Sequence, residues 1–565
     1  MKRLRKIWRE VPADSGAVQK LTQELNGFEP LARMLVSRGI HNLQQVQSFR
    51  EGTPQDHVDP WSMADMKTAA HRLKEAKDNQ ELVWLFGDYD VDGTTAVSVG
   101  KLALEQGGWR VATYIPDRYA EGYGLSKQGI DSAVQAGSSL MITLDCGIKS
   151  HELIQYAQDH GIDVIVTDHH QPGETLPPAV AVLDPVRSDC AFPETSISGC
   201  GVGYLLWWSA YEYAGLDTAP LGACHDLLAI SIGADMVPLQ GLNRWWAHRG
   251  LEQINHQPRP AVAALLGEKL RHGPINLQDV VFTIGPKINA AGRMRHGHWA
   301  VDLMTTPQPD LLAHLSQNIS DFNVERRAEE QALVEVAAQQ ATAFEDAPAL
   351  VLSGEGWHKG VLGIVAQRLV ERFHKPTIVL SANEGILNGS ARTAGNLDLY
   401  QAIDAASEYL IQFGGHRAAA GMTLEAHQLE DFRAAFTQQV EATWSREDRQ
   451  PTQTIDALCH LNELNPRLIA LQERLAPFGQ GFPIPTWGLK NVQLTQVRRM
   501  SDGKHLKAVL VDENGSGALD VIGFGWGDFD ALQQPVDVAV HLEWNHFRGQ
   551  SKLQARIVDL QPHHG

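Results

Sequence analysis

The feature that most constrains this chain is an apolar run, from Leu82 to Phe86, that leads directly into an acidic cluster. A short apolar run that ends this abruptly is typical of a buried strand. Asp88, Asp90 and Asp92 follow it, and carboxylates this close repel one another unless protons or cations neutralise them. A divalent metal ion is the simplest neutralising partner, and a solvated acidic turn is the ordinary alternative. The stretch therefore predicts a strand with a metal site at its carboxyl end.

Strands and helices alternate from this point onward, and Gly107, Gly108 and Gly161 follow two of the helices. Repeated βα units form a parallel sheet that is covered by helices on both faces, so we expect an α/β fold. The pattern predicts strands at 82–86, 111–115, 140–144 and 162–167, and helices at 94–106, 127–136 and 151–160.

Further acidic and histidine residues follow other strands of the predicted sheet. Asp145 follows one strand in the sequence LDCG, and Asp168, His169 and His170 follow another in VTDHH. The carboxyl ends of parallel strands share one crevice, so these side chains are expected to meet Asp88, Asp90 and Asp92 there and to hold a pair of divalent ions. Asp168 has an alternative role as a cap of the following segment. Asp235 ends an apolar helix, and spacing alone favours a cap or surface role for it.

Length and composition bound the class of protein. A chain of 565 residues predicts about three domains. The net charge of −19 means that any nucleic-acid binding depends on local basic patches. The five cysteines form no CxxC pair and are odd in number, so they indicate neither a disulfide framework nor a zinc knuckle and fit a reducing cytoplasm. No apolar run has the length of a membrane span or a signal-peptide core, so we expect a soluble protein of the cytoplasm.

The patterns along the chain predict five segments. The first is a helical prelude, the second the α/β domain with the acidic clusters, and the third a long helix from about 310 to 345 that lacks proline and glycine. A second α/β domain and a barrel of five alternating strands, the number in an OB fold, complete the chain. The predicted boundaries are 1–60, 61–305, 306–346, 347–450 and 451–565.

The last two segments carry features suited to nucleic acids. In the second α/β domain, strands are expected at 349–353 and 377–380 around a helix at 361–373, and the glycine-rich sequences NGSAR and GGHRAAAG are interpreted as turns that an anion can approach. Near one barrel hairpin lie Arg498, Arg499, Lys504, His505 and Lys507. The aromatic residues of the barrel are candidates either for base stacking or for its core, namely Trp487, Trp526, Trp544 and Phe547.

Seven motifs in order give the chain a close resemblance to the DHH phosphoesterases and, within them, to the RecJ family of single-strand-specific exonucleases. The resemblance implies a DHH catalytic domain, a DHH-associated domain and a C-terminal OB fold. The motifs are DYDVDG (88–93), EGYG (121–124), DCG (145–147), DHH (168–170), SGCGVG (198–203), ADMVPL (234–239) and PKINAAGRM (286–294).

The resemblance also implies roles for individual residues. Asp90 and Asp92 would each hold one of two metal ions and Asp145 would bridge them, while His169 and Asp235 would complete the second site. His170 would contact the scissile phosphate, and Asp88 would be a further ligand or an acceptor that orients one. The remaining substrate contacts would be Arg293, expected in a loop, and Ser390, Arg392 and His416 at the 5′ phosphate end of the strand.

Two observations narrow the chemistry within the superfamily. Relatives that hydrolyse pyrophosphate or very short oligonucleotides have a histidine at the position of Phe86, so its absence here favours the exonuclease branch. Carboxylate ligands with imidazole and without thiolate suit Mn²⁺ or Mg²⁺.

The implied function is a 5′-to-3′ exonuclease that degrades single-stranded DNA to 5′-mononucleotides by two-metal hydrolysis, in DNA recombination and repair. Single-strand-binding protein and a RecQ-type helicase are the implied protein partners. The alternatives are an oligonucleotide or cyclic-dinucleotide phosphodiesterase of the same superfamily, and a non-catalytic replication scaffold.

Overall fold

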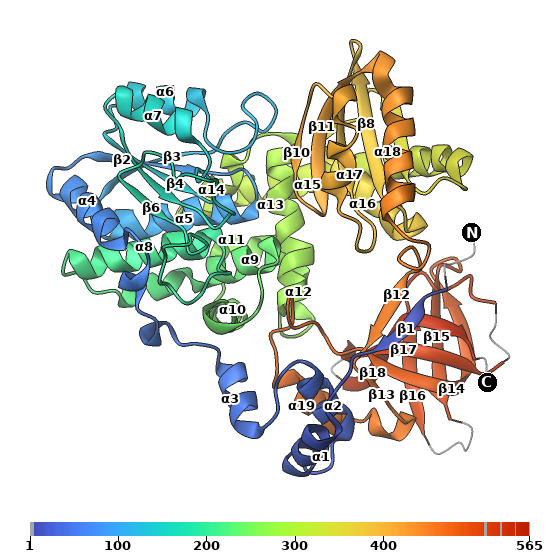
Figure 1. The fold of residues 1–565 in the computed structure, drawn as a ribbon. Coiled ribbons are helices and arrows are strands. Elements are labelled where there is room, and N and C mark those ends of the chain that lie inside the picture. Colours follow the sequence, from blue (N-terminus) through green and yellow to red (C-terminus); the bar gives the residue numbers. More distant parts are fainter. Residues whose placement is uncertain (1–4, 513–516, 531–533, 548–549, 564–565) are drawn as a thin grey trace. The chain divides into compact units, whose positions relative to one another are not determined.

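A computed structural model of the chain describes residues 5–512, 517–530, 534–547 and 550–563 (Figure 1). The chain forms two compact units. One contains residues 1–10 and 324–454, and the other contains residues 11–323 and 455–565. Among the described residues, no helix combines the length and apolar character needed to cross a membrane.

The acidic clusters lie on a five-stranded sheet in which every neighbouring pair is parallel, as predicted. The strand order is β3-β2-β4-β5-β6, so successive connections change direction between β2 and β4. Such a switch point opens a crevice at the carboxyl ends of the two strands. The strands are β2 (Leu82–Gly87), β3 (Arg110–Tyr114), β4 (Leu140–Leu144), β5 (Asp163–Thr167) and β6 (Ala181–Leu183).

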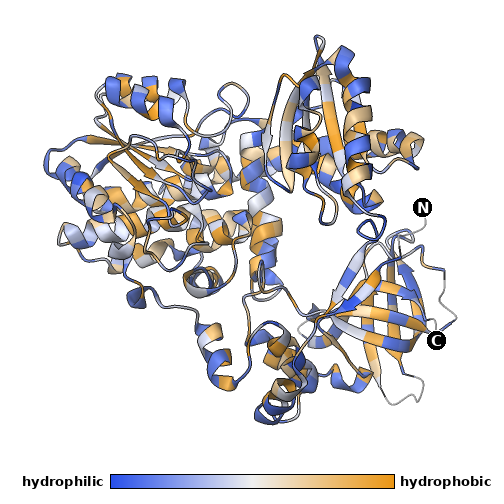
Figure 2. Ribbon diagram, viewed as in Figure 1, coloured by the Kyte–Doolittle hydropathy of each residue, from blue (hydrophilic) through white to orange (hydrophobic). Residues whose placement is uncertain are grey.

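Helices cover both faces of this sheet because its strands are apolar on both sides (Figure 2). Val83 and Leu85 face one core, which includes residues of α4, α5, α8 and α9. Trp84 and Phe86 face the opposite core, which includes residues of α6 and α7. The helices of this domain are α4 (Met66–Asp78), α5 (Val91–Gln106), α6 (Lys127–Gln135), α7 (His151–Asp159), α8 (Gly199–Tyr213), α9 (His225–Asp235), α10 (Gly241–His256), α11 (Pro260–Leu266), α12 (Leu277–Asp279), α13 (Gly285–Met294) and α14 (His298–Thr305).

The C-terminal strands close into a barrel of five strands, as predicted, in the order β14-β15-β16-β18-β17 with β17 pairing back to β14. A short parallel strand, β13 (Ala457–Leu458), extends the sheet beside β14. The barrel strands are β14 (Trp487–Met500), β15 (His505–Val511), β16 (Ala518–Gly523), β17 (Val536–Phe547) and β18 (Gln550–Pro562).

The N-terminal helices pack into the core of this barrel. Leu21, Met34 and Leu35 belong to one apolar cluster with Leu468 and Trp487. The segment that the sequence left without a function therefore completes the barrel's core, together with a helix that precedes the barrel. These helices are α1 (Ser15–Glu24), α2 (Glu29–Ser37), α3 (Leu43–Glu51) and α19 (Pro466–Glu473).

The long helix α15 (Pro309–Ala341) is continuous, as predicted, and a single 3₁₀ turn follows it at 342–344. Beyond it lies a mixed sheet in the order β10-β11-β9-β8-β7, in which only β7 and β8 run parallel. Its elements are β7 (Leu350–Glu355), α16 (Leu362–Phe373), β8 (Thr377–Asn383), β9 (Ile386–Arg392), α17 (Leu399–Asp404), β10 (Gln412–Gly415), β11 (Ala419–Glu425) and α18 (Leu429–Thr443). In the same unit β1 (Ile7–Glu10) pairs with β12 (Thr452–Ile455).

The interpretation of NGSAR as a turn is wrong, because these residues form the second half of β9. Close packing between the strands accounts for Gly389, because a Cβ at this position would lie 2.4 Å from Cδ2 of Leu380 on the neighbouring strand. In GGHRAAAG only the residues between β10 and β11 form a turn, where the His416 N–H donates to the Ala419 carbonyl at 2.8 Å. The glycines therefore mark close strand contacts as well as turns.

Candidate metal centre

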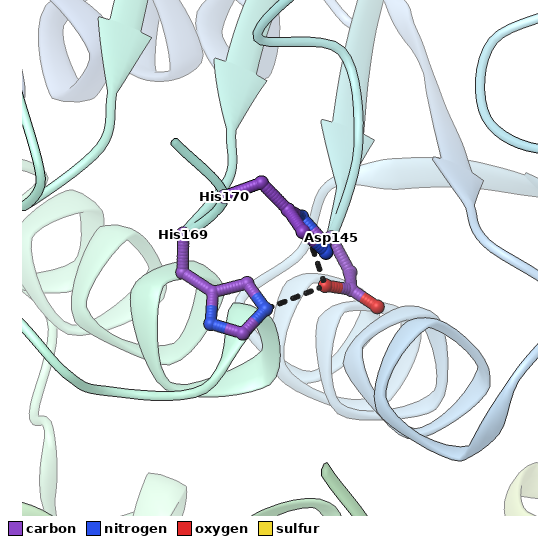
Figure 3. Close-up of side chains that lie close together, drawn as sticks. All are labelled: Asp145, His169 and His170. Atoms are coloured by element: carbon purple, nitrogen blue, oxygen red, sulfur yellow. Dashed lines mark ion pairs between the residues drawn. The ribbon is translucent and has the colours of Figure 1, made fainter. Parts of the chain in front are cut away.

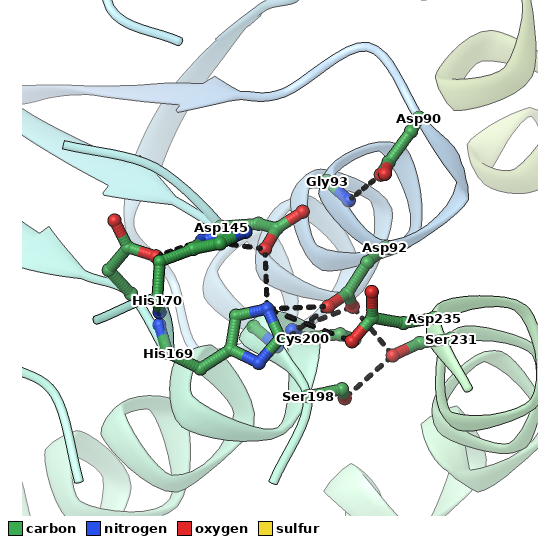
Figure 4. A network of polar contacts seen from close by, with 12 residues as sticks. Asp90, Asp92, Gly93, Asp145, His169, His170, Ser198, Cys200, Ser231 and Asp235 are labelled. Carbon is green, nitrogen blue, oxygen red and sulfur yellow. Dashed lines mark hydrogen bonds and ion pairs between the residues drawn. The ribbon is translucent and has the colours of Figure 1, made fainter. Parts of the chain in front are cut away.

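The carboxyl edge of the parallel sheet brings the predicted acidic residues together (Figure 4). Helix α5 begins at Val91, earlier than the predicted start at residue 94, so Asp90 is its N-cap and accepts the Gly93 N–H at 3.1 Å. Asp92 then lies in the first turn of the helix. Asp145 follows β4, His169 and His170 follow β5, and Asp235 is the last residue of α9.

These side chains form two groups, and in each the possible ligand atoms lie within 4.8 Å of one another. The Asp90 group contains Asp88, Asp90 and Asp145, and the Asp92 group contains Asp92, His169 and Asp235. A third set of the same spacing, Asp145 with His169 and His170, connects the two groups. Figure 3 shows this connection, in which Nε2 of His169 lies 3.1 Å from Oδ1 of Asp145. Asp145 therefore belongs to the Asp90 group and also contacts a member of the Asp92 group.

Several of the atoms that meet here lack a hydrogen bond. Asp88 and Asp145 are 1% and 3% exposed. Within the part of the chain that the structure describes, Oδ1 of Asp88, Oδ1 of Asp145 and Nε2 of His169 are buried without a hydrogen-bond partner. Unpaired buried polar atoms are costly and need an explanation. Carboxylate oxygens and an imidazole nitrogen directed at one another fit divalent cations such as Mn²⁺ and Mg²⁺.

The electrostatics of the cluster lead to the same conclusion. Burial, together with the charge of Asp90, raises the pKa of Asp88 to about 8. Burial and the charge of Asp92 raise the pKa of Asp235 to about 7. Burial and the surrounding aspartates also raise the pKa of Asp145 well above its ordinary value. Without cations, several of these carboxyl groups would therefore hold protons near neutral pH.

Helix α8 fixes the position of Asp92. The backbone N–H groups of Gly199 and Cys200, in its first turn, donate to the Asp92 carboxylate at 2.7 and 2.9 Å. The Ser231 hydroxyl donates to the same carboxylate at 2.6 Å. The N-terminus of a helix favours an anion, so this arrangement stabilises the charged carboxylate. The motif SGCGVG is thus explained as the helix start that holds Asp92, a role that the sequence did not reveal.

Asp168 orients the two histidines and belongs to neither ligand group. Its carboxylate accepts the Ile148 and His169 N–H groups at 3.0 and 2.8 Å, and Nδ1 of His170 lies 2.7 Å away. Although burial alone would raise the pKa of Asp168, the hydrogen bond and charge of His170 bring it below its ordinary value. These contacts agree with the alternative role predicted for Asp168, which is to cap the segment that follows it.

The residues after β4 adopt an uncommon backbone. Asp145 has a φ of 62°, in the left-handed region that residues other than glycine rarely occupy. Such outliers persist where the surrounding structure enforces them, and they concentrate at functional sites. The neighbouring Cys146 is 1% exposed and packs in the apolar core with Phe86, so it is a buried apolar residue.

Arg293 lies in the last turn of α13, so its predicted placement in a loop is wrong. The Tyr119 hydroxyl donates to the Arg293 carbonyl at 2.6 Å. Burial raises the pKa of Tyr89, next to Asp88, whereas the charges of Arg118 and Arg293 act in the opposite direction. Arg293 therefore has its charge close to the first motif. Tyr123 belongs to the motif EGYG, but the sequence indicated no role for it. Its hydroxyl lies 3.3 Å from Nε2 of His170.

The predicted phosphate contacts of the other unit lie near one end of its sheet. Ser390 and Arg392 are alternate residues of β9 and so project to the same face. Arg392 is paired with Ala419, and His416 is hydrogen-bonded to that residue across the turn. The Arg392 guanidinium covers Gly363, where a Cβ would lie 2.7 Å from Nη2.

The barrel separates its aromatic residues from its basic ones. Trp487 and Trp526 are buried in the core of the barrel, so of the two roles predicted for them the core role is the correct one. Trp544 is half-buried against the same core, and the side chain of Phe547 lies outside the described residues. The basic residues remain at the surface of the β14–β15 hairpin, where Arg498 is paired with Lys507 across the strands.

Comparisons with known proteins agree with this arrangement. Three family models match: the DHH family N-terminal domain at residues 82–232, the DHHA1 domain at 346–442 and the RecJ OB domain at 455–559. The single-stranded-DNA-specific exonuclease RecJ of Dickeya dadantii is 32% identical over 94% of this chain and 96% of its own length. The chain belongs to the RecJ family.

Other members of the family resemble the chain over similar lengths. The RecJ exonuclease of Bacillus subtilis is 34% identical, over 98% of this chain and 70% of its own. The crystal structure of Thermus thermophilus RecJ in complex with Mn²⁺ matches with a TM-score of 0.85 and 27% identity, covering 99% of this chain and 80% of that one. The complex of the same protein with Mg²⁺ matches with a TM-score of 0.79.

Proposed function

We propose that this chain is a single-stranded-DNA-specific exonuclease that removes 5′-mononucleotides from the 5′ end by metal-assisted hydrolysis. The observation that carries the proposal is the pair of ligand groups at the switch point of the sheet, connected by the contact of Asp145 with His169, in a member of the RecJ family. Hydrolysis of a phosphodiester by this arrangement needs no protein nucleophile.

Two Mn²⁺ or Mg²⁺ ions are the proposed occupants of the two groups. Asp90 and Asp145 would hold one ion, and Asp92, His169 and Asp235 would hold the other. Asp145, which lies 3.1 Å from Nε2 of His169, is the ligand proposed to serve both ions. Bound ions of this kind supply an activated water and neutralise charge on the phosphate and the leaving oxygen. The remaining work of the chain is to hold the phosphate and the water in line and to exclude other nucleophiles.

Asp88 is proposed as a further ligand of the first ion. Its unpaired Oδ1 belongs to the Asp90 group. Phe86, which occupies the position of a histidine in some relatives, is fully buried, and its ring stacks on Tyr114 at a centroid distance of 5.4 Å. Because a phenyl ring carries no ligand atom, Phe86 cannot replace that histidine. Asp88 is proposed to take its place as a ligand.

His170 is proposed to contact the scissile phosphate. The contact with Asp168 fixes Nδ1, so Nε2 is directed toward the Tyr123 hydroxyl, 3.3 Å away, on a side chain that is partly exposed. An imidazole fixed in this way presents a defined nitrogen to an anion. Arg293 is a further proposed phosphate contact.

Recognition of the strand is proposed to depend on phosphates and not on base sequence. Ser390, Arg392 and His416 would bind the phosphates at the 5′ end, and the basic β14–β15 hairpin would bind the strand electrostatically. In the cell, such an enzyme would act in DNA recombination and repair in the cytoplasm, with single-strand-binding protein and a RecQ-type helicase as partners. Co-purification with each partner separately would test that assignment.

The decisive experiment offers labelled single-stranded and blunt duplex DNA with Mn²⁺ or Mg²⁺. We expect mononucleotides from the single strand alone, released from the 5′ end, and no products after chelation. Equal digestion of both substrates, or mainly internal fragments, would refute the proposal. Replacing Asp145 with Ala should abolish hydrolysis while DNA binding persists, because Asp145 belongs to the Asp90 group and also contacts His169 of the Asp92 group.

A further inference from the structure

The ligands of the Asp92 group come from segments that are far apart in the sequence. His169 is oriented through Nδ1, which lies 3.0 Å from the Ile197 carbonyl oxygen. Asp235 ends α9, and the chain then turns sharply at Met236, which has a φ of 57° and is 65% exposed. The geometry of this group therefore depends on what fixes the segment around Ile197 relative to the loop 236–240 that follows Asp235.

Asn243, in the first turn of α10, connects these two segments. Its Nδ2 donates to the Ser196 carbonyl at 2.7 Å and to the Pro238 carbonyl at 3.0 Å. Ser196 immediately precedes Ile197, and Pro238 lies three residues after Asp235. Asn243 is 3% exposed, so water does not readily replace these bonds. One amide group thus joins the segment that orients His169 to the loop that follows Asp235.

The loop 236–240 is also held from its other side by the segment that leads into the barrel. The Leu239 N–H donates to the Gln480 carbonyl at 2.9 Å. At Gly479 a Cβ would lie 2.9 Å from Cδ1 of Leu239, so the Leu239 side chain packs closely against the Gly479 backbone. Loop 236–240 therefore has defined contacts on both sides, and Asn243 supplies the one that reaches the histidine.

Arg244, the next residue, anchors this entering segment. It is fully buried, and its guanidinium donates to the Pro477 carbonyl at 3.0 Å and to the Leu475 carbonyl. It also lies over the Phe49 ring, 3.9 Å from the ring centre. The first turn of α10 thus holds loop 236–240 directly through Asn243 and indirectly through Arg244.

We propose that Asn243 is a positioning residue of the second ion site, and that it sets the separation of His169 and Asp235. The inference rests on the proposed metal-dependent nuclease. Partners that orient the ligands of a metal ion commonly change its affinity by 10- to 100-fold when they are lost. Without Asn243, loop 236–240 keeps its contact with Gln480 but loses its connection to the histidine segment, so only the Asp92 group is loosened.

Mn²⁺ binding measured by electron paramagnetic resonance on the full chain tests this inference without relying on activity. In Asn243→Ala we expect one of the two ions to bind about tenfold more weakly, while the other retains its wild-type affinity. Asn243→Ser keeps one donor and should give an intermediate loss. The serine variant also keeps the test possible if the alanine variant fails to fold. In exonuclease assays, excess Mn²⁺ should restore the kcat of both variants to within about twofold of wild type.

Asn255→Ala is the matched control. Asn255 lies on the same helix, and its Nδ2 also donates to two carbonyl groups, those of Leu251 and Ile275, but neither belongs to a ligand segment. Asn255 is exposed, so its loss should lower the thermal midpoint less than the loss of the buried Asn243, and it should leave both Mn²⁺ affinities unchanged. Unchanged Mn²⁺ binding in Asn243→Ala, equal weakening of both ions, or equal weakening in the control would overturn the inference. A wild-type chain that neither binds Mn²⁺ nor degrades single-stranded DNA would instead refute the proposed function.

Discussion

Gly199 lies against Asp145, the carboxylate that connects the two ligand groups. A Cβ at position 199 would lie 2.5 Å from Oδ1 and 2.7 Å from Cβ of Asp145. Real Cβ atoms do not come this close, so any side chain here must displace the shared ligand or the start of α8. Glycine is therefore required at position 199 for a steric reason, which is the closeness of Asp145. The backbone conformation of a turn is not the reason.

Gly199→Ala should consequently abolish most of the activity without unfolding the chain. We expect kcat to fall at least about 100-fold, since a misplacement of about 1 Å has effects of this size, while single-stranded-DNA binding changes little. Gly222→Ala is a suitable control, because its Cβ would be no closer than 3.7 Å to any neighbour. Steady-state kinetics and circular dichroism on both variants provide the measurement, and near-wild-type kcat in Gly199→Ala would contradict the geometry.

Asp168 permits a second test at the same scale, because it orients His170 without belonging to a ligand group. Asp168→Asn should lower kcat about 10- to 100-fold through misorientation of the ring. Mn²⁺ affinity should change less than in Asp92→Asn, which removes a proposed ligand. Titration of Mn²⁺ binding, together with kcat, separates the two variants. If both lose Mn²⁺ to the same extent, Asp168 has a direct ligand role.

At the scale of elements, the sequence predicted those parts of the centre that follow from strand ends. Asp145, His169 and His170 each follow a recognisable apolar run, so parallel-sheet topology was enough to bring them together. The early start of α5 was missed because the three aspartates were interpreted as a loop, although an aspartate N-cap at Asp90 is a common helix start. Asp235 came from family resemblance alone, since nothing in a helix end specifies a partner across the fold.

Other elements were missed because their roles depend on distant partners. The N-terminal helices show helical patterns, but their core lies in a barrel that begins more than 400 residues later in the chain. Asn243 has no motif that distinguishes it from any surface asparagine, and only the two carbonyls that it joins reveal its position. Strand β9 was hidden by its glycine and small residues, which favour turns in isolation.

Because the proposed ligands come from five different elements, bound ions should stabilise the folded chain. At a free Mn²⁺ concentration of about 100 times the Kd, one site contributes about 2.7 kcal/mol to the free energy of unfolding. We therefore expect Mn²⁺ to raise the thermal midpoint of the wild type and EDTA to reverse the shift. Asp145→Ala, which removes the shared ligand, should show little shift in differential scanning fluorimetry. If Mn²⁺ raised the thermal midpoint of this variant as much as that of the wild type, the stabilising ion would bind at another site.

At the scale of the whole molecule, a strongly acidic chain must bind a polyanion. The net charge is −19, yet the β14–β15 hairpin collects exposed cations on one edge of the barrel. Arg498 and Lys507 are direct cross-strand neighbours, and like charges placed opposite one another destabilise a sheet. A bound phosphate chain would relieve this repulsion, so the pair suits binding better than folding.

Replacing both residues, as Arg498→Ala with Lys507→Ala, should weaken binding of long single strands uniformly across base sequences. The dependence of log affinity on log salt concentration should become shallower by about 1.4, at about 0.7 for each lost phosphate contact on a single strand. The thermal midpoint should stay the same or rise, because the repulsion is removed. Hydrolysis of very short oligonucleotides should be unaffected, since the ligand groups are intact.

Fluorescence anisotropy across a salt series measures the slope, with Lys490→Ala, an exposed cation elsewhere on β14, as the control. An unchanged slope in the double variant, or an equal change in the control, would move the strand-binding surface away from this hairpin.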